Sequence, residues 1–256
     1  MLLQLRQVRK SYGAVQVIHD LDLDVREAEF VGVIGPNGAG KTTAFGLIAG
    51  SLACDAGEVR LDGANVSALD AAARCRSGIG RTFQIPQPFA GMTVYENALV
   101  ASSFGAGLRG KAACDKAREV LETCALADRA DRPAATLSLL DRKRLELARA
   151  LATQPRLLLL DEVGGGLTDP EVAQLLALVT SIHRSGVTIL WIEHIVHALV
   201  SVVDRLVVLA EGAMLADGLP HEVLASRAVR QSYLGEELSF GADAAAPAQG
   251  APHAAH

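Results

Sequence analysis

The stretch FVGVIGPNGAGKTTAFGLIAG, residues 30–50, joins a short apolar run to a glycine-rich turn and then to a helical pattern. Its centre, GPNGAGKT at residues 35–42, fits the spacing G-x-x-x-x-G-K-S/T. Glycines let successive backbone N–H groups curl around a phosphate, and the following helix N-terminus adds positive potential. We therefore predict a phosphate loop, in which Lys41 reaches the outer phosphates and Thr42 binds Mg²⁺. The predicted nucleotide contacts are Gly35, Pro36, Asn37, Gly38, Ala39, Gly40, Lys41, Thr42 and Thr43.

Further strands are indicated on both sides of this loop. RLLLLD at residues 156–161 and VTILWIE at residues 187–193 are short and almost wholly apolar, as is typical of strands buried on both faces of a parallel sheet. LLQLRQV at residues 2–8 and HDLDLDV at residues 19–25 alternate polar with apolar residues, which indicates a half-exposed antiparallel sheet. The predicted fold is α/β: a P-loop NTPase core with a mainly parallel sheet and an antiparallel β layer.

A helical subdomain is predicted at about residues 85–150, where strand signals fade and patterns such as KAACDKAREVLETCALA take over. From residue 204 onward, two strands joined by Glu211-Gly212 precede a helix that begins near Pro220. Residues 239–256 are rich in Ala, Pro, Gly and His without periodicity, and we expect a disordered tail there. The predicted cassette domain therefore covers residues 1–238, with the helical subdomain inserted in its core.

Bulk properties exclude several classes of protein. The formal net charge of −5 argues against a general nucleic-acid binder, which needs a surplus of Lys and Arg. The four cysteines lack metal-ligand spacing, so we expect free thiols in a reducing compartment. No signal peptide is evident, and the most apolar stretch, residues 187–209, is interrupted by charged residues. The sequence predicts no membrane span.

Polar side chains follow two of the predicted buried strands. Asp161 and Glu162 end LLLLDE, where Asp161 would hold Mg²⁺ through water and Glu162 would act as general base on the attacking water. His194 follows the strand at residues 187–193, from which its side chain would reach the terminal phosphate. A zinc site at Glu193-His194-x-x-His197 is the alternative, but the spacing is not H-E-x-x-H and the segment begins as a strand.

Six ordered motifs resemble those of the nucleotide-binding subunit of an ATP-binding-cassette transporter. They are, in chain order, the phosphate loop, RTFQ at residues 81–84, LSLLDRKRLELARAL at residues 137–151, LLLLDE, GLTD at residues 166–169 and IEH at residues 192–194. The resemblance covers about residues 1–238. More narrowly, GIGRTFQIPQPFAGMTVYENALVAS and the ending YLGEE resemble the ATPase subunits of branched-chain amino acid uptake systems.

The resemblance implies ATP and Mg²⁺ as cofactors and assigns roles by position. Tyr12 matches the aromatic residue that stacks on adenine, and Gln84 the glutamine that contacts Mg²⁺ and the attacking water. His194 matches the histidine that contacts the γ-phosphate. The segment just after Gln84 would touch the membrane subunits. Asp169 lies beside a loop that crosses the dimer interface, although Thr168 stands where many relatives have Asp or Asn.

LSLLD, residues 137–141, departs from the family pattern, and we call it the signature segment. In this family two cassettes face each other head to tail, and each signature segment covers the partner's ATP. Ser138 is kept for that contact, but Leu139 and Leu140 stand where the family has two glycines or a Tyr-Gly pair, and Asp141 replaces glutamine. Leucine does not easily take positive φ and keeps a backbone away from a phosphate. We also expect Asp141 to cap the following helix, residues 141–150, and to repel phosphate.

The departure leads to a hypothesis about assembly. The site completed by this segment would be slow or structural, so a heterodimer with a second ATPase subunit is favoured over a homodimer; an alternative is that Ser138 and the helix N-terminus suffice. In the helix that follows, Leu145, Ala148 and Leu151 define the apolar face. The same spacing predicts that the charge run 142–144, Arg-Lys-Arg, lies largely on the solvated side.

The predicted function is that of an ATPase subunit of a membrane importer, for branched-chain or hydrophobic amino acids or related small amides. The expected partners are a second ATPase subunit, two permease subunits and, indirectly, a solute-binding protein, with no nucleic acid. The expected location is peripheral, on the cytoplasmic face of the inner or plasma membrane. A soluble cassette ATPase acting on ribosomes or DNA is an alternative, and a phosphoryl transferase built on the same loop is another.

Overall fold

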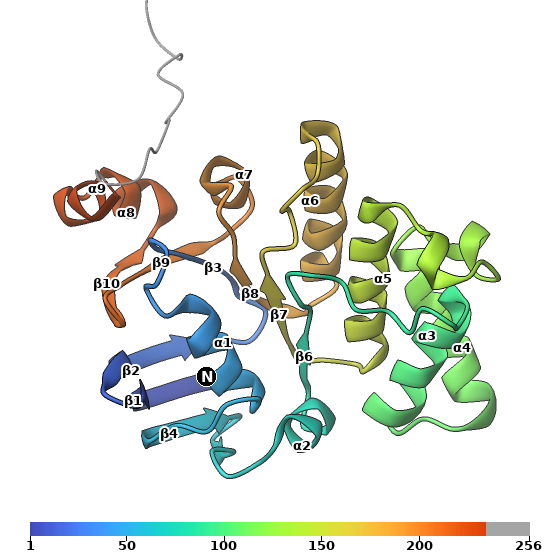
Figure 1. Cartoon of the computed structure of the whole chain (residues 1–256), viewed down its shortest axis with the longest axis horizontal. Helices are drawn as coiled ribbons and strands as arrows, with labels where there is room; N and C mark the ends of the chain where they lie inside the picture. Colours follow the sequence, from blue (N-terminus) through green and yellow to red (C-terminus); the bar gives the residue numbers. More distant parts are fainter. Residues whose placement is uncertain (234–256) are drawn as a thin grey trace, which may run out of the picture.

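The computed structural model describes residues 1–233, which form two sheets and a group of helices beside them (Figure 1). The predicted cassette boundary at residue 238 and the predicted tail at 239–256 lie outside the described residues. The strands are β1 Leu3–Tyr12, β2 Val15–Val25, β3 Phe30–Ile34, β4 Ala56–Leu61, β5 Ala64–Asn65, β6 Ile79–Arg81, β7 Leu157–Asp161, β8 Thr188–Ile192, β9 Arg205–Ala210 and β10 Ala213–Gly218. The α-helices are α1 Lys41–Ala49, α2 Ala71–Arg76, α3 Val94–Val100, α4 Gly110–Thr123, α5 Leu139–Ala152, α6 Asp169–Arg184, α7 Val196–Val200, α8 Pro220–Ala225 and α9 Arg227–Tyr233.

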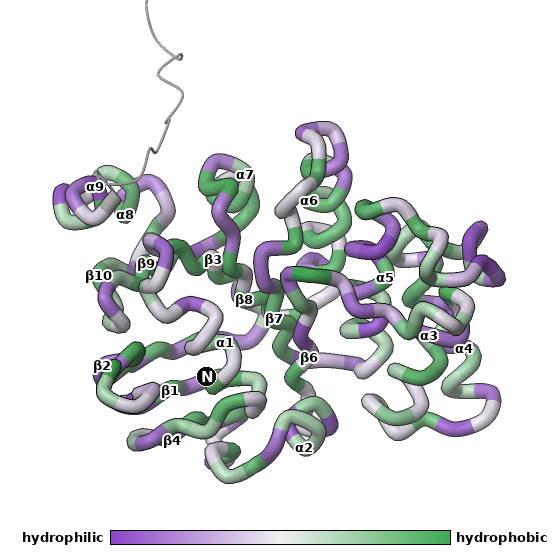
Figure 2. The backbone as a smooth tube through the Cα atoms, viewed as in Figure 1, coloured by the Kyte–Doolittle hydropathy of each residue, from purple (hydrophilic) through white to green (hydrophobic). Residues whose placement is uncertain are grey.

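The central sheet has the order β10-β9-β3-β8-β7-β6. Strands β6 to β9 run parallel to their neighbours, and β10 pairs antiparallel with β9. Every residue of β3, β7 and β8 is buried, because these strands lie in the middle of the sheet with both faces covered. In Figure 2 they appear as the hydrophobic centre of the molecule.

Helix α1 lies between the central sheet and the antiparallel sheet, whose order is β2-β1-β4-β5 (Figure 1). Seven of its nine residues are buried. Phe45, Leu47 and Ile48 share one apolar core with Leu5 of the antiparallel sheet and Leu159 of the central sheet. The helix that follows the phosphate loop is therefore held from both sides.

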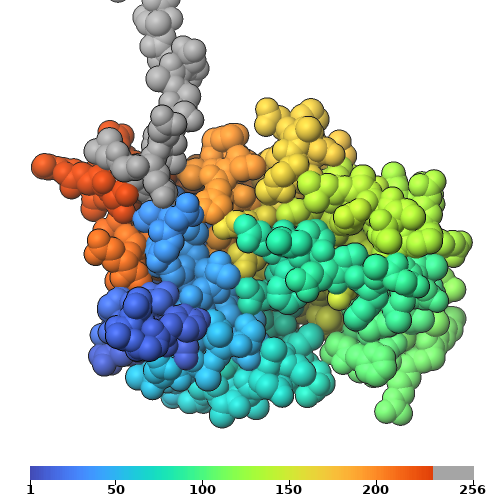
Figure 3. Space-filling model, in the orientation of Figure 1, coloured from blue at the N-terminus to red at the C-terminus, as the bar shows by residue number. Residues whose placement is uncertain are grey.

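The helical subdomain is inserted between β6 and β7. It contains α3, α4 and α5, with a π-helix at Ala101–Gly105 and two 3₁₀ helices at Ala127–Arg129 and Ala134–Thr136. In the space-filling view it forms the green lobe beside the rest of the molecule (Figure 3). None of the helices within residues 1–233 is long and apolar enough to cross a membrane.

The topology brings the carboxyl ends of β3, β8 and β7 to one edge of the sheet. Val33 of β3 and Asp161 of β7 both pair with Ile192 of β8, so the three strands end at the same level. The phosphate loop, the acidic pair and the histidine predicted from sequence follow these strands directly. The predicted fold class is confirmed, with both sheets and the helical subdomain in place.

Candidate functional site: the phosphate loop and the carboxyl ends of three strands

The phosphate loop has backbone geometry that its glycines make possible. A Cβ at Gly35 would lie 2.1 Å from the carbonyl oxygen of Leu209, a clash that excludes any larger residue. Gly40 caps α1 with φ 93°, a left-handed conformation that favours glycine. Lys41 is 6% exposed, and its Nζ donates to the carbonyls of Gly35 at 2.6 Å and Pro36 at 3.0 Å. The ammonium thus lies inside the curl of the loop.

A cavity of about 200 Å³ opens over this loop. Backbone N–H groups at a helix N-terminus and a lysine favour an anion there. One carboxylate, that of Glu162, reaches the same cavity from the end of β7. The lining residues are Val17, Asn37, Gly38, Ala39, Gly40, Lys41, Thr42, Thr43 and Glu162.

Asp161 ends β7 as a buried carboxylate, 3% exposed, held by a cation that the sequence prediction did not include. Arg81 at the end of β6 pairs with it, with Nη2 2.9 Å from Oδ2. Burial raises the pKa of Asp161, and the hydrogen bond and charge of Arg81 oppose that rise. The guanidinium therefore favours the ionised form, which is the form that coordinates a cation.

Three residues predicted to act in catalysis, Glu162, His194 and Gln84, meet above the loop. Glu162 has φ 48°, so its backbone is in the left-handed region, and its N–H donates to the carbonyl of Ile192 at 2.9 Å. Its Oε1 lies 2.6 Å from Nε2 of His194. Nε2 of Gln84 donates to its Oε2.

Results

Sequence analysis

The stretch FVGVIGPNGAGKTTAFGLIAG, residues 30–50, joins a short apolar run to a glycine-rich turn and then to a helical pattern. Its centre, GPNGAGKT at residues 35–42, fits the spacing G-x-x-x-x-G-K-S/T. Glycines let successive backbone N–H groups curl around a phosphate, and the following helix N-terminus adds positive potential. We therefore predict a phosphate loop, in which Lys41 reaches the outer phosphates and Thr42 binds Mg²⁺. The predicted nucleotide contacts are Gly35, Pro36, Asn37, Gly38, Ala39, Gly40, Lys41, Thr42 and Thr43.

Further strands are indicated on both sides of this loop. RLLLLD at residues 156–161 and VTILWIE at residues 187–193 are short and almost wholly apolar, as is typical of strands buried on both faces of a parallel sheet. LLQLRQV at residues 2–8 and HDLDLDV at residues 19–25 alternate polar with apolar residues, which indicates a half-exposed antiparallel sheet. The predicted fold is α/β: a P-loop NTPase core with a mainly parallel sheet and an antiparallel β layer.

A helical subdomain is predicted at about residues 85–150, where strand signals fade and patterns such as KAACDKAREVLETCALA take over. From residue 204 onward, two strands joined by Glu211-Gly212 precede a helix that begins near Pro220. Residues 239–256 are rich in Ala, Pro, Gly and His without periodicity, and we expect a disordered tail there. The predicted cassette domain covers residues 1–238, with the helical subdomain inserted in its core.

Bulk properties argue against several classes of protein. The formal net charge of −5 disfavours a general nucleic-acid binder, which needs a surplus of Lys and Arg. The four cysteines lack metal-ligand spacing, so we expect free thiols in a reducing compartment. No signal peptide is evident, and the most apolar stretch, residues 187–209, is interrupted by charged residues. The sequence predicts no membrane span.

Polar side chains follow two of the predicted buried strands. Asp161 and Glu162 end LLLLDE, where Asp161 would hold Mg²⁺ through water and Glu162 would act as general base on the attacking water. His194 follows the strand at residues 187–193, from which its side chain would reach the terminal phosphate. A zinc site at Glu193-His194-x-x-His197 is the alternative, but the spacing is not H-E-x-x-H and the segment begins as a strand.

Six ordered motifs resemble those of the nucleotide-binding subunit of an ATP-binding-cassette transporter. They are, in chain order, the phosphate loop, RTFQ at residues 81–84, LSLLDRKRLELARAL at residues 137–151, LLLLDE, GLTD at residues 166–169 and IEH at residues 192–194. The resemblance covers about residues 1–238. More narrowly, GIGRTFQIPQPFAGMTVYENALVAS and the ending YLGEE resemble the ATPase subunits of branched-chain amino acid uptake systems.

The resemblance implies ATP and Mg²⁺ as cofactors and assigns roles by position. Tyr12 matches the aromatic residue that stacks on adenine, and Gln84 the glutamine that contacts Mg²⁺ and the attacking water. His194 matches the histidine that contacts the γ-phosphate. The segment just after Gln84 would touch the membrane subunits. Asp169 lies beside a loop that crosses the dimer interface, although Thr168 stands where many relatives have Asp or Asn.

LSLLD, residues 137–141, departs from the family pattern, and we call it the signature segment. In this family two cassettes face each other head to tail, and each signature segment covers the partner's ATP. Ser138 is kept for that contact, but Leu139 and Leu140 stand where the family has two glycines or a Tyr-Gly pair, and Asp141 replaces glutamine. Leucine does not easily take positive φ, and its Cβ keeps the backbone away from a phosphate. We also expect Asp141 to cap the following helix and to repel phosphate.

This departure leads to a hypothesis about assembly. The site completed by the signature segment would be slow or structural, so a heterodimer with a second ATPase subunit is favoured over a homodimer. The alternative is that Ser138 and the helix N-terminus suffice. In the helix that follows, Leu145, Ala148 and Leu151 define the apolar face. The same spacing predicts that the charge run Arg-Lys-Arg at residues 142–144 lies largely on the solvated side.

The predicted function is that of an ATPase subunit of a membrane importer, for branched-chain or hydrophobic amino acids or related small amides. The expected partners are a second ATPase subunit, two permease subunits and, indirectly, a solute-binding protein, with no nucleic acid. The expected location is peripheral, on the cytoplasmic face of the inner or plasma membrane. A soluble cassette ATPase acting on ribosomes or DNA is an alternative, and a phosphoryl transferase built on the same loop is another.

Overall fold

The computed structural model describes residues 1–233, which form two sheets with helices packed around them (Figure 1). The predicted cassette boundary at residue 238 and the predicted tail at 239–256 lie outside the described residues. The strands are β1 Leu3–Tyr12, β2 Val15–Val25, β3 Phe30–Ile34, β4 Ala56–Leu61, β5 Ala64–Asn65, β6 Ile79–Arg81, β7 Leu157–Asp161, β8 Thr188–Ile192, β9 Arg205–Ala210 and β10 Ala213–Gly218. The α-helices are α1 Lys41–Ala49, α2 Ala71–Arg76, α3 Val94–Val100, α4 Gly110–Thr123, α5 Leu139–Ala152, α6 Asp169–Arg184, α7 Val196–Val200, α8 Pro220–Ala225 and α9 Arg227–Tyr233.

The central sheet has the strand order β10-β9-β3-β8-β7-β6. Strands β6, β7, β8, β3 and β9 run parallel, and β10 pairs antiparallel with β9. Every residue of β3, β7 and β8 is buried, because these strands lie inside the sheet with both faces covered. They belong to the hydrophobic centre of the backbone tube in Figure 2.

Helix α1 lies between the central sheet and the antiparallel sheet, whose order is β2-β1-β4-β5 (Figure 1). Seven of its nine residues are buried. Phe45, Leu47 and Ile48 share one apolar core with Leu5 of the antiparallel sheet and Leu159 of the central sheet. The helix that follows the phosphate loop is therefore held from both sides.

The helical subdomain is inserted between β6 and β7. It contains α3, α4 and α5, with a π-helix at Ala101–Gly105 and 3₁₀ helices at Ala127–Arg129 and Ala134–Thr136. In the space-filling view it forms the green lobe beside the rest of the molecule (Figure 3). None of the helices within residues 1–233 is long and apolar enough to cross a membrane.

The topology brings the carboxyl ends of β3, β8 and β7 to one edge of the central sheet. Val33 of β3 and Asp161 of β7 both pair with Ile192 of β8, so the three strands end at a similar level. The phosphate loop, the acidic pair and the predicted histidine follow these strands directly. The predicted fold class is confirmed, with the parallel core, the antiparallel layer and the helical subdomain in place.

Candidate functional site: the phosphate loop and the ends of three strands

The phosphate loop has a backbone geometry that its glycines make possible. A Cβ at Gly35 would lie 2.1 Å from the carbonyl oxygen of Leu209, so a larger residue would clash there. Gly40 caps α1 with φ 93°, a left-handed conformation that favours glycine. Lys41 is 6% exposed, and its Nζ donates to the carbonyls of Gly35 at 2.6 Å and Pro36 at 3.0 Å. The ammonium thus lies inside the curl of the loop.

A cavity of about 200 Å³ opens over this loop. Backbone N–H groups at a helix N-terminus, together with a lysine, favour an anion in such a cavity. The carboxylate of Glu162 reaches the same cavity from the end of β7. The lining residues are Val17, Asn37, Gly38, Ala39, Gly40, Lys41, Thr42, Thr43 and Glu162.

Asp161, the last residue of β7, is a buried carboxylate paired with a cation to which the sequence prediction gave no role. Asp161 is 3% exposed, and Nη2 of Arg81 at the end of β6 lies 2.9 Å from its Oδ2. Burial raises the pKa of Asp161, and the hydrogen bond and charge of Arg81 oppose that rise. The guanidinium therefore favours the ionised carboxylate, which is the form that binds cations.

Glu162, His194 and Gln84, the three predicted catalytic residues, meet at the cavity edge. Glu162 has φ 48°, so its backbone lies in the left-handed region, and its N–H donates to the carbonyl of Ile192 at 2.9 Å. Its Oε1 lies 2.6 Å from Nε2 of His194, and its Oε2 accepts a hydrogen bond from Nε2 of Gln84. The three residues follow β7, β8 and β6, whose adjacency in the sheet brings them together.

Tyr12 and Ser138 lie outside the set of residues that line this cavity. Tyr12 ends β1 with 49% of its surface exposed, and Nζ of Lys10 lies 5.7 Å from its ring centroid. Ser138 is the N-cap of α5, and its Oγ accepts a hydrogen bond from the N–H of Asp141 at 3.2 Å. The adenine contact of Tyr12 and the contact of Ser138 with a partner's ATP stay predictions.

Two expectations about the helix after the signature segment are corrected. Helix α5 begins at Leu139, and its N-cap is Ser138 rather than Asp141. The carboxylate of Asp141 pairs with Nη1 of Arg144 at 3.4 Å on the same helix and with Nε of Arg129 at 3.1 Å, which ends the 3₁₀ helix Ala127–Arg129. These arginines offset its negative charge, so Asp141 repels a phosphate less than the sequence alone indicated.

The expectation that the charge run 142–144 lies largely on the solvated side is wrong for Lys143. Its surface is 3% exposed, and its Nζ donates to the carbonyls of Gln84 at 2.9 Å and Glu162 at 3.3 Å. Burial lowers the pKa of Lys143, and nearby carboxylates, Glu193 foremost, oppose that change. The apolar spacing of α5 gave the wrong exposure because the segment after Gln84 covers a further face of the helix.

Glu193 is another residue whose role the sequence prediction did not find. It is 4% exposed, and its carboxylate accepts hydrogen bonds from the N–H groups of Gly164 and His194, both at 3.0 Å. It therefore fastens the turn after β7, which carries Glu162, to the turn after β8. A carboxylate at the end of an almost wholly apolar strand was the available signal.

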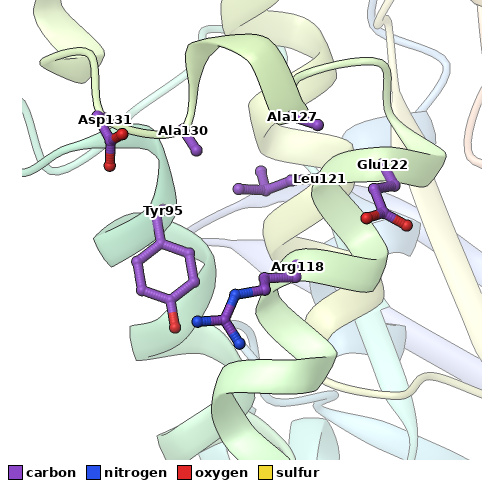
Figure 4. A pocket seen from close by; sticks show the side chains of 7 residues that line it. All are labelled: Tyr95, Arg118, Leu121, Glu122, Ala127, Ala130 and Asp131. Atoms are coloured by element: carbon purple, nitrogen blue, oxygen red, sulfur yellow. The ribbon is translucent and has the colours of Figure 1, made fainter.

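A second hollow, of about 360 Å³, lies in the helical subdomain. Tyr95 of α3 and Arg118 of α4 face each other at its mouth, with the guanidinium carbon 5.7 Å from the ring centroid (Figure 4). Its other lining residues are Leu121, Glu122, Ala127, Ala130 and Asp131. This second hollow is separate from the cavity between the phosphate loop and Glu162. The phosphate loop residues and Glu162, which the motifs predict to act on nucleotide, lie at that other cavity.

Residues 18–164, more than half of the chain, match the ABC transporter family. The chain belongs to this family. It is 37% identical over 250 residues to the high-affinity branched-chain amino acid transport ATP-binding protein BraF of Pseudomonas aeruginosa, a match that covers 92% of this chain and 98% of BraF. It is 36% identical over 250 residues to the corresponding protein LivG of Salmonella typhimurium, covering 92% and 98%. The lipopolysaccharide export system ATP-binding protein LptB of Escherichia coli K12 is 34% identical over 233 residues, covering 91% and 97%.

Solved structures of ABC cassettes agree with this assignment. An ATP-binding cassette in its ADP conformation superposes with a TM-score of 0.84 at 29% identity, over 92% of this chain and 99% of that one. A nucleotide-free cassette gives a TM-score of 0.83 at 28% identity, with the same coverage. The chain is thus the ATP-hydrolysing subunit of an ABC transporter, which works as a cassette dimer with permease partners.

Proposed function

We propose that this ATPase subunit powers an importer of branched-chain or hydrophobic amino acids, or of related small amides. The observation that carries the proposal is the match to BraF and LivG along 98% of each. The proposed partners are a second ATPase subunit, two permeases and a solute-binding protein, at the cytoplasmic face of the inner or plasma membrane. The proposed cassette spans residues 1–238, with its helical subdomain at about 85–150.

We assign the attack on ATP to the residues that meet at the cavity edge. Glu162 is the general base: it takes a proton from water as the oxygen attacks the γ-phosphorus and the bond to the β-phosphate oxygen breaks. Gln84 and His194 each hold one of its carboxylate oxygens, which orients the base before substrate arrives. His194 would then face the γ-phosphate, and Tyr12 would stack on adenine.

The donor chemistry at the site suits Mg²⁺, which proteins bind through oxygen atoms of carboxylates together with substrate phosphates. Thr42 offers a hydroxyl, Asp161 a carboxylate that Arg81 keeps ionised, and Gln84 an amide oxygen. When bound, the cation neutralises charge on the phosphates. These three residues are the proposed metal ligands, with Asp161 acting through water.

We propose that the signature segment completes the partner's nucleotide site poorly and that the chain therefore forms a heterodimer. Leu140 is 7% exposed, so it packs into its own chain, and Leu139 is 40% exposed. Loss of a preorganised donor to a reacting phosphoryl group costs about 10²–10³ in rate, whereas a helix-end charge such as that of Asp141 changes energy by about 0.3–1 kcal/mol. The loss of the glycine backbone geometry is therefore expected to lower the rate of hydrolysis more than the charge of Asp141 does.

The segment after Gln84 is the proposed contact with the permeases. Three large apolar side chains there are exposed: Ile85 by 72%, Phe89 by 44% and Met92 by 38%. Apolar side chains gathered on an exposed segment are typical of an interaction surface. Closure of the cassettes on ATP would move this segment, since it joins β6 to the helical subdomain.

Lipopolysaccharide export is a second candidate, because LptB matches 91% of this chain at nearly the same identity as BraF. Cells that carry Glu162→Gln in place of the natural chain separate the two functions. We expect loss of radiolabelled leucine, isoleucine and valine uptake with unchanged lipopolysaccharide at the cell surface. Unchanged uptake with depleted surface lipopolysaccharide would favour export, and loss of neither would contradict both.

A further inference from the structure

Lys143 lies just over one turn from the helix end that would meet the partner's nucleotide. It is the fifth residue of α5, which begins directly after Ser138. Its ammonium is buried, and a buried charge is tolerated only where hydrogen bonds replace the lost water. The replacements are two backbone carbonyls, those of Gln84 at 2.9 Å and Glu162 at 3.3 Å.

These carbonyls belong to the two residues whose side chains are joined by the hydrogen bond from Gln84 Nε2 to Glu162 Oε2. The ammonium of Lys143 therefore binds the backbone of both residues, next to the hydrogen bond between their side chains. Glu162 has φ 48°, a conformation that non-glycine residues adopt only when their surroundings hold them in it. The hydrogen bond from Lys143 is one such constraint.

Further contacts extend this attachment along α5. Oε1 of Glu146 accepts a hydrogen bond from the N–H of Gln87 at 2.7 Å. Nη1 of Arg149 donates to the carbonyl of Gln87 at 2.8 Å. Lys143, Glu146 and Arg149 are three residues apart, so they share one face of the helix. That face fastens the segment from Gln84 to Gln87 to α5.

The other cations of the charge run make different contacts. Arg142 is exposed, and its Nε donates to the carbonyl of Leu137 at 2.9 Å. Arg144 contacts Asp141 and, at 2.9 Å, the side-chain oxygen of Gln174. Arg142 is therefore a matched control, since it has the same charge and the neighbouring position on the same helix.

We propose that Lys143 is a positioning residue for ATP hydrolysis, which sets Gln84 against Glu162 and ties that pair to the signature end of α5. The proposal rests on the proposed roles of Glu162 and Gln84.

The test is a comparison of Lys143→Met, Lys143→Arg, Arg142→Met and Glu162→Gln in the full chain assembled with its transporter subunits. Misplacing a reacting group by about 1 Å costs about 10²-fold in rate. We expect Lys143→Met to lower kcat by about that factor, with KM for ATP and the affinity for a fluorescent ADP analogue within about threefold of the natural chain. Lys143→Arg keeps N–H donors and a positive charge but not the compact ammonium, so it should retain more of kcat than Lys143→Met, and Arg142→Met should keep kcat unchanged.

An unchanged kcat in Lys143→Met would overturn the proposal. A parallel fall of kcat, nucleotide affinity and melting temperature would overturn it too, because that pattern indicates general loss of structure. If the Met variant does not fold, Lys143→Gln is compared with Lys143→Arg by the same criteria. An active Glu162→Gln variant contradicts the proposed role of Glu162, whereas an inactive Glu162→Gln beside an active Lys143→Met contradicts only the role of Lys143.

Discussion

Replacement of Arg81 by Met removes the cation that Asp161 needs inside the protein. The two side chains are 14% and 5% exposed, with 2.9 Å between Nη2 and Oδ2. Breaking a buried pair by removing one partner costs about 3–5 kcal/mol. Nε of Arg81 is buried without a hydrogen-bond partner among the described residues, so the pair is not fully satisfied and we expect the lower end, about 3 kcal/mol. For a chain of this size the loss corresponds to a melting temperature lower by about 6–12 °C.

The pH dependence of this loss follows from Asp161.

Results

Sequence analysis

The stretch FVGVIGPNGAGKTTAFGLIAG, residues 30–50, joins a short apolar run to a glycine-rich turn and then to a helical pattern. Its centre, GPNGAGKT at residues 35–42, fits the spacing G-x-x-x-x-G-K-S/T. Glycines let successive backbone N–H groups curl around a phosphate, and the following helix N-terminus adds positive potential. We therefore predict a phosphate loop, in which Lys41 reaches the outer phosphates and Thr42 binds Mg²⁺. The predicted nucleotide contacts are Gly35, Pro36, Asn37, Gly38, Ala39, Gly40, Lys41, Thr42 and Thr43.

Further strands are indicated on both sides of this loop. RLLLLD at residues 156–161 and VTILWIE at residues 187–193 are short and almost wholly apolar, as is typical of strands buried on both faces of a parallel sheet. LLQLRQV at residues 2–8 and HDLDLDV at residues 19–25 alternate polar with apolar residues, which indicates a half-exposed antiparallel sheet. The predicted fold is α/β: a P-loop NTPase core with a mainly parallel sheet and an antiparallel β layer.

A helical subdomain is predicted at about residues 85–150, where strand signals fade and patterns such as KAACDKAREVLETCALA take over. Later, two strands joined at residues 211–212 precede a helix that begins near Pro220. Residues 239–256 are rich in Ala, Pro, Gly and His without periodicity, and we expect a disordered tail there. The predicted cassette domain covers residues 1–238, with the helical subdomain inserted in its core.

Bulk properties argue against several classes of protein. The formal net charge of −5 disfavours a general nucleic-acid binder, which needs a surplus of Lys and Arg. The four cysteines lack metal-ligand spacing, so we expect free thiols in a reducing compartment. No signal peptide is evident, and the most apolar stretch, residues 187–209, is interrupted by charged residues. The sequence predicts no membrane span.

Polar side chains follow two of the predicted buried strands. Asp161 and Glu162 end LLLLDE, where Asp161 would hold Mg²⁺ through water and Glu162 would act as general base on the attacking water. His194 follows VTILWIE, from which its side chain would reach the terminal phosphate. A zinc site at Glu193-His194-x-x-His197 is the alternative, but the spacing is not H-E-x-x-H and the segment begins as a strand.

Six ordered motifs resemble those of the nucleotide-binding subunit of an ATP-binding-cassette transporter. They are, in chain order, the phosphate loop, RTFQ at residues 81–84, LSLLDRKRLELARAL at residues 137–151, LLLLDE, GLTD at residues 166–169 and IEH at residues 192–194. The resemblance covers about residues 1–238. More narrowly, GIGRTFQIPQPFAGMTVYENALVAS and the ending YLGEE resemble the ATPase subunits of branched-chain amino acid uptake systems.

The resemblance implies ATP and Mg²⁺ as cofactors and assigns roles by position. Tyr12 matches the aromatic residue that stacks on adenine, and Gln84 the glutamine that contacts Mg²⁺ and the attacking water. His194 matches the histidine that contacts the γ-phosphate. The segment just after Gln84 would touch the membrane subunits. Asp169 lies beside a loop that crosses the dimer interface, although Thr168 stands where many relatives have Asp or Asn.

LSLLD, residues 137–141, departs from the family pattern, and we call it the signature segment. In this family two cassettes face each other head to tail, and each signature segment covers the partner's ATP. Ser138 is kept for that contact, but Leu139 and Leu140 stand where the family has two glycines or a Tyr-Gly pair, and Asp141 replaces glutamine. Leucine does not easily take positive φ, and its Cβ keeps the backbone away from a phosphate. We also expect Asp141 to cap the following helix and to repel phosphate.

This departure leads to a hypothesis about assembly. The site completed by the signature segment would be slow or structural, so a heterodimer with a second ATPase subunit is favoured over a homodimer. The alternative is that Ser138 and the helix N-terminus suffice. In the helix that follows, Leu145, Ala148 and Leu151 define the apolar face. The same spacing predicts that the charge run Arg-Lys-Arg at residues 142–144 lies largely on the solvated side.

The predicted function is that of an ATPase subunit of a membrane importer, for branched-chain or hydrophobic amino acids or related small amides. The expected partners are a second ATPase subunit, two permease subunits and, indirectly, a solute-binding protein, with no nucleic acid. The expected location is peripheral, on the cytoplasmic face of the inner or plasma membrane. A soluble cassette ATPase acting on ribosomes or DNA is an alternative, and a phosphoryl transferase built on the same loop is another.

Overall fold

The computed structural model describes residues 1–233, which form two sheets with helices packed around them (Figure 1). The predicted cassette boundary at residue 238 and the predicted tail at 239–256 lie outside the described residues. The strands are β1 Leu3–Tyr12, β2 Val15–Val25, β3 Phe30–Ile34, β4 Ala56–Leu61, β5 Ala64–Asn65, β6 Ile79–Arg81, β7 Leu157–Asp161, β8 Thr188–Ile192, β9 Arg205–Ala210 and β10 Ala213–Gly218. The α-helices are α1 Lys41–Ala49, α2 Ala71–Arg76, α3 Val94–Val100, α4 Gly110–Thr123, α5 Leu139–Ala152, α6 Asp169–Arg184, α7 Val196–Val200, α8 Pro220–Ala225 and α9 Arg227–Tyr233.

The central sheet has the strand order β10-β9-β3-β8-β7-β6. Strands β6, β7, β8, β3 and β9 run parallel, and β10 pairs antiparallel with β9. Every residue of β3, β7 and β8 is buried, because these strands lie inside the sheet with both faces covered. They belong to the hydrophobic centre of the backbone tube in Figure 2.

Helix α1 lies between the central sheet and the antiparallel sheet, whose order is β2-β1-β4-β5 (Figure 1). Seven of its nine residues are buried. Phe45, Leu47 and Ile48 share one apolar core with Leu5 of the antiparallel sheet and Leu159 of the central sheet. The helix that follows the phosphate loop is therefore held from both sides.

The helical subdomain is inserted between β6 and β7. It contains α3, α4 and α5, with a π-helix at Ala101–Gly105 and 3₁₀ helices at Ala127–Arg129 and Ala134–Thr136. In the space-filling view it forms the green lobe beside the rest of the molecule (Figure 3). None of the helices within residues 1–233 is long and apolar enough to cross a membrane.

The topology brings the carboxyl ends of β3, β8 and β7 to one edge of the central sheet. Val33 of β3 and Asp161 of β7 both pair with Ile192 of β8, so the three strands end at a similar level. The phosphate loop, the acidic pair and the predicted histidine follow these strands directly. The predicted fold class is confirmed, with the parallel core, the antiparallel layer and the helical subdomain in place.

Candidate functional site: the phosphate loop and the ends of three strands

The phosphate loop has a backbone geometry that its glycines make possible. A Cβ at Gly35 would lie 2.1 Å from the carbonyl oxygen of Leu209, so a larger residue would clash there. Gly40 caps α1 with φ 93°, a left-handed conformation that favours glycine. Lys41 is 6% exposed, and its Nζ donates to the carbonyls of Gly35 at 2.6 Å and Pro36 at 3.0 Å. The ammonium thus lies inside the curl of the loop.

A cavity of about 200 Å³ opens over this loop. Backbone N–H groups at a helix N-terminus, together with a lysine, favour an anion in such a cavity. Glu162 reaches the same cavity from the end of β7. The lining residues are Val17, Asn37, Gly38, Ala39, Gly40, Lys41, Thr42, Thr43 and Glu162.

Asp161, the last residue of β7, is a buried carboxylate paired with a cation to which the sequence prediction gave no role. Asp161 is 3% exposed, and Nη2 of Arg81 at the end of β6 lies 2.9 Å from its Oδ2. Burial raises the pKa of Asp161, and the hydrogen bond and charge of Arg81 oppose that rise. The guanidinium therefore favours the ionised carboxylate, which is the form that binds cations.

Glu162, His194 and Gln84, the three predicted catalytic residues, meet beside the cavity. Glu162 has φ 48°, so its backbone lies in the left-handed region, and its N–H donates to the carbonyl of Ile192 at 2.9 Å. Its Oε1 lies 2.6 Å from Nε2 of His194, and its Oε2 accepts a hydrogen bond from Nε2 of Gln84. The three residues follow β7, β8 and β6, whose adjacency in the sheet brings them together.

Tyr12 and Ser138 lie outside the set of residues that line this cavity. Tyr12 ends β1 with 49% of its surface exposed, and Nζ of Lys10 lies 5.7 Å from its ring centroid. Ser138 is the N-cap of α5, and its Oγ accepts a hydrogen bond from the N–H of Asp141 at 3.2 Å. The adenine contact of Tyr12 and the contact of Ser138 with a partner's ATP stay predictions.

Two expectations about the helix after the signature segment are corrected. Helix α5 begins at Leu139, and its N-cap is Ser138 rather than Asp141. The carboxylate of Asp141 pairs with Nη1 of Arg144 at 3.4 Å on the same helix and with Nε of Arg129 at 3.1 Å, which ends the 3₁₀ helix Ala127–Arg129. These arginines offset its negative charge, so Asp141 repels a phosphate less than the sequence alone indicated.

The expectation that the charge run 142–144 lies largely on the solvated side is wrong for Lys143. Its surface is 3% exposed, and its Nζ donates to the carbonyls of Gln84 at 2.9 Å and Glu162 at 3.3 Å. Burial lowers the pKa of Lys143, and nearby carboxylates, Glu193 foremost, oppose that change. The apolar spacing of α5 indicated the wrong exposure because the segment after Gln84 covers a further face of the helix.

Glu193 is another residue whose role the sequence prediction did not find. It is 4% exposed, and its carboxylate accepts hydrogen bonds from the N–H groups of Gly164 and His194, both at 3.0 Å. It therefore fastens the turn after β7, which carries Glu162, to the turn after β8. A carboxylate at the end of an almost wholly apolar strand was the available signal.

A second hollow, of about 360 Å³, lies in the helical subdomain. Tyr95 of α3 and Arg118 of α4 face each other there, with the guanidinium carbon 5.7 Å from the ring centroid (Figure 4). This second hollow is separate from the cavity between the phosphate loop and Glu162. The phosphate loop residues and Glu162, which the motifs predict to act on nucleotide, lie at that other cavity. The other lining residues of the second hollow are Leu121, Glu122, Ala127, Ala130 and Asp131.

Residues 18–164, more than half of the chain, match the ABC transporter family. The chain belongs to this family. It is 37% identical over 250 residues to the high-affinity branched-chain amino acid transport ATP-binding protein BraF of Pseudomonas aeruginosa, a match that covers 92% of this chain and 98% of BraF. It is 36% identical over 250 residues to the corresponding protein LivG of Salmonella typhimurium, covering 92% and 98%. The lipopolysaccharide export system ATP-binding protein LptB of Escherichia coli K12 is 34% identical over 233 residues, covering 91% and 97%.

Solved structures of ABC cassettes agree with this assignment. An ATP-binding cassette in its ADP conformation superposes with a TM-score of 0.84 at 29% identity, over 92% of this chain and 99% of that one. A nucleotide-free cassette gives a TM-score of 0.83 at 28% identity, with the same coverage. The chain is thus the ATP-hydrolysing subunit of an ABC transporter, a role that implies a cassette dimer and permease partners.

Proposed function

We propose that this ATPase subunit powers an importer of branched-chain or hydrophobic amino acids, or of related small amides. The observation that carries the proposal is the match to BraF and LivG along 98% of each. The proposed partners are a second ATPase subunit, two permeases and a solute-binding protein, at the cytoplasmic face of the inner or plasma membrane. The proposed cassette spans residues 1–238, with its helical subdomain at about 85–150.

We assign the attack on ATP to the residues that meet beside the cavity. Glu162 is the proposed general base: it takes a proton from water as the oxygen attacks the γ-phosphorus and the bond to the β-phosphate oxygen breaks. Gln84 and His194 each contact one of its carboxylate oxygens, which orients the base before substrate arrives. His194 would then face the γ-phosphate, and Tyr12 would stack on adenine.

The donor chemistry at the site suits Mg²⁺, which proteins bind through oxygen atoms of carboxylates together with substrate phosphates. Thr42 offers a hydroxyl, Asp161 a carboxylate that Arg81 helps to keep ionised, and Gln84 an amide oxygen. When bound, the cation neutralises charge on the phosphates. These three residues are the proposed metal ligands, with Asp161 acting through water.

We propose that the signature segment completes the partner's nucleotide site poorly and that the chain therefore forms a heterodimer. Leu140 is 7% exposed, so it packs into its own chain, and Leu139 is 40% exposed. Loss of a preorganised donor to a reacting phosphoryl group costs about 10²–10³ in rate, whereas a helix-end charge such as that of Asp141 changes energy by about 0.3–1 kcal/mol. The loss of the glycine backbone geometry is therefore expected to lower the rate of hydrolysis more than the charge of Asp141 does.

The segment after Gln84 is the proposed contact with the permeases. Three large apolar side chains there are exposed: Ile85 by 72%, Phe89 by 44% and Met92 by 38%. Apolar side chains gathered on an exposed segment are typical of an interaction surface. Closure of the cassettes on ATP would move this segment, since it joins β6 to the helical subdomain.

Lipopolysaccharide export is a second candidate, because LptB matches 91% of this chain at nearly the same identity as BraF. Cells that carry Glu162→Gln in place of the natural chain separate the two functions. We expect loss of radiolabelled leucine, isoleucine and valine uptake with unchanged lipopolysaccharide at the cell surface. Unchanged uptake with depleted surface lipopolysaccharide would favour export, and loss of neither would contradict both.

A further inference from the structure

Lys143 lies just over one turn from the helix end that would meet the partner's nucleotide. It is on α5, which begins at Leu139, directly after Ser138. Its ammonium is buried, and burying a charge is costly unless it is hydrogen-bonded. Two backbone carbonyls accept from it, those of Gln84 at 2.9 Å and Glu162 at 3.3 Å.

These carbonyls belong to the two residues whose side chains are joined by the hydrogen bond from Gln84 Nε2 to Glu162 Oε2. The ammonium of Lys143 therefore binds the backbone of both residues, next to the hydrogen bond between their side chains. Glu162 has φ 48°, a conformation that non-glycine residues keep only when their surroundings hold them in it. The hydrogen bond from Lys143 is one such constraint.

Further contacts extend this attachment along α5. Oε1 of Glu146 accepts a hydrogen bond from the N–H of Gln87 at 2.7 Å. Nη1 of Arg149 donates to the carbonyl of Gln87 at 2.8 Å. Lys143, Glu146 and Arg149 follow the i, i+3 spacing that places residues on one side of a helix. That side of α5 holds the segment from Gln84 to Gln87.

The other cations of the charge run make different contacts. Arg142 is exposed, and its Nε donates to the carbonyl of Leu137 at 2.9 Å. Arg144 contacts Asp141 and, at 2.9 Å, the side-chain oxygen of Gln174. Arg142 is therefore a matched control, since it has the same charge and the neighbouring position on the same helix.

We propose that Lys143 is a positioning residue for ATP hydrolysis, which sets Gln84 against Glu162 and ties that pair to the signature end of α5. The proposal rests on the proposed roles of Glu162 and Gln84.

The test compares Lys143→Met, Lys143→Arg, Arg142→Met and Glu162→Gln in the full chain assembled with its transporter subunits. Misplacing a reacting group by about 1 Å costs about 10²-fold in rate. We expect Lys143→Met to lower kcat by about that factor, with KM for ATP and the affinity for a fluorescent ADP analogue within about threefold of the natural chain. Lys143→Arg keeps N–H donors and a positive charge but not the compact ammonium, so it should retain more of kcat than Lys143→Met, and Arg142→Met should keep kcat unchanged.

An unchanged kcat in Lys143→Met would overturn the proposal. A parallel fall of kcat, nucleotide affinity and melting temperature would overturn it too, because that pattern indicates general loss of structure. If the Met variant does not fold, Lys143→Gln is compared with Lys143→Arg by the same criteria. An active Glu162→Gln variant contradicts the proposed role of Glu162, whereas an inactive Glu162→Gln beside an active Lys143→Met contradicts only the role of Lys143.

Discussion

Replacement of Arg81 by Met removes the cation that Asp161 contacts inside the protein. The two side chains are 14% and 5% exposed, with 2.9 Å between Nη2 and Oδ2. Breaking a buried pair by removing one partner costs about 3–5 kcal/mol. Nε of Arg81 is buried without a hydrogen-bond partner among the described residues, so we expect the lower end, about 3 kcal/mol. For a chain of this size the loss corresponds to a melting temperature lower by about 6–12 °C.

The pH dependence of this loss follows from Asp161. Burial raises its pKa, and the variant lacks the main opposing influence, so the folded-state pKa rises further. When the folded-state pKa of a carboxyl group is raised, the group ionises less readily in the folded protein than in the unfolded chain. The resulting contribution to stability is fully present below the unfolded-state pKa and is lost as pH rises through the folded-state pKa. Thermal unfolding without nucleotide should therefore show a larger deficit for Arg81→Met near pH 8 than near about pH 5.

Asp161→Asn supplies the control for this interpretation. In that background the carboxylate is absent, so adding Arg81→Met should lower the melting temperature much less than it does in the natural chain. An equal loss in both backgrounds, or a deficit independent of pH, would show that Arg81 stabilises the fold through packing rather than through Asp161.

Three further predictions concern the site. Glu162→Gln should lower kcat by about 10²–10⁴-fold while Mg²⁺-dependent ATP binding persists, because a general base is lost and the phosphate loop is intact. Phosphate release at the natural rate would rule out Glu162 as the base. Leu140→Gly combined with Asp141→Gln should raise ATP turnover of the chain alone by up to about 10²-fold, since it restores the backbone approach to phosphate. Unchanged turnover would mean that the signature segment is not what limits the rate. Gly35→Ala should abolish measurable nucleotide binding, because its Cβ would lie 2.1 Å from a backbone oxygen of β9, whereas Gly38→Ala meets no atom within 4 Å and should bind more tightly than Gly35→Ala. Equal affinities of the two would contradict the steric argument.

The buried strands were predictable because a strand covered on both faces is apolar at every position. The runs that became β3, β7 and β8 are of this kind, and parallel neighbours end at one edge of a sheet. The approach of Glu162 to His194 could therefore be predicted from the apolar sequence pattern of the two strands that precede them. The role of Gln84 could be predicted only from the family resemblance, since the preceding strand β6 has only three residues and an ordinary composition.

The contacts of Arg81 and Lys143 were not predictable from the same patterns. Arg81 reaches Asp161 because the register of β6 on β7 pairs Arg81 with Leu159, two residues before Asp161. Lys143 is buried because a segment distant in sequence crosses α5. Helical periodicity identifies the apolar face of a helix, but it does not report which polar side chains a neighbouring segment covers.

The position of the helical subdomain between two paired strands has a mechanical consequence. Its two connections leave the carboxyl end of β6 and enter the amino end of β7, so a rotation of the subdomain against the sheet would turn about these two segments. Helix α5 ends at Ala152, shortly before β7 begins, and its 14 residues extend about 21 Å from there to the signature segment. A rotation of about 10° would displace that end by about 4 Å, on the order of the pitch of one helical turn. The helix is therefore a lever arm, and small angular changes at the sheet become large translations at the face of the cassette.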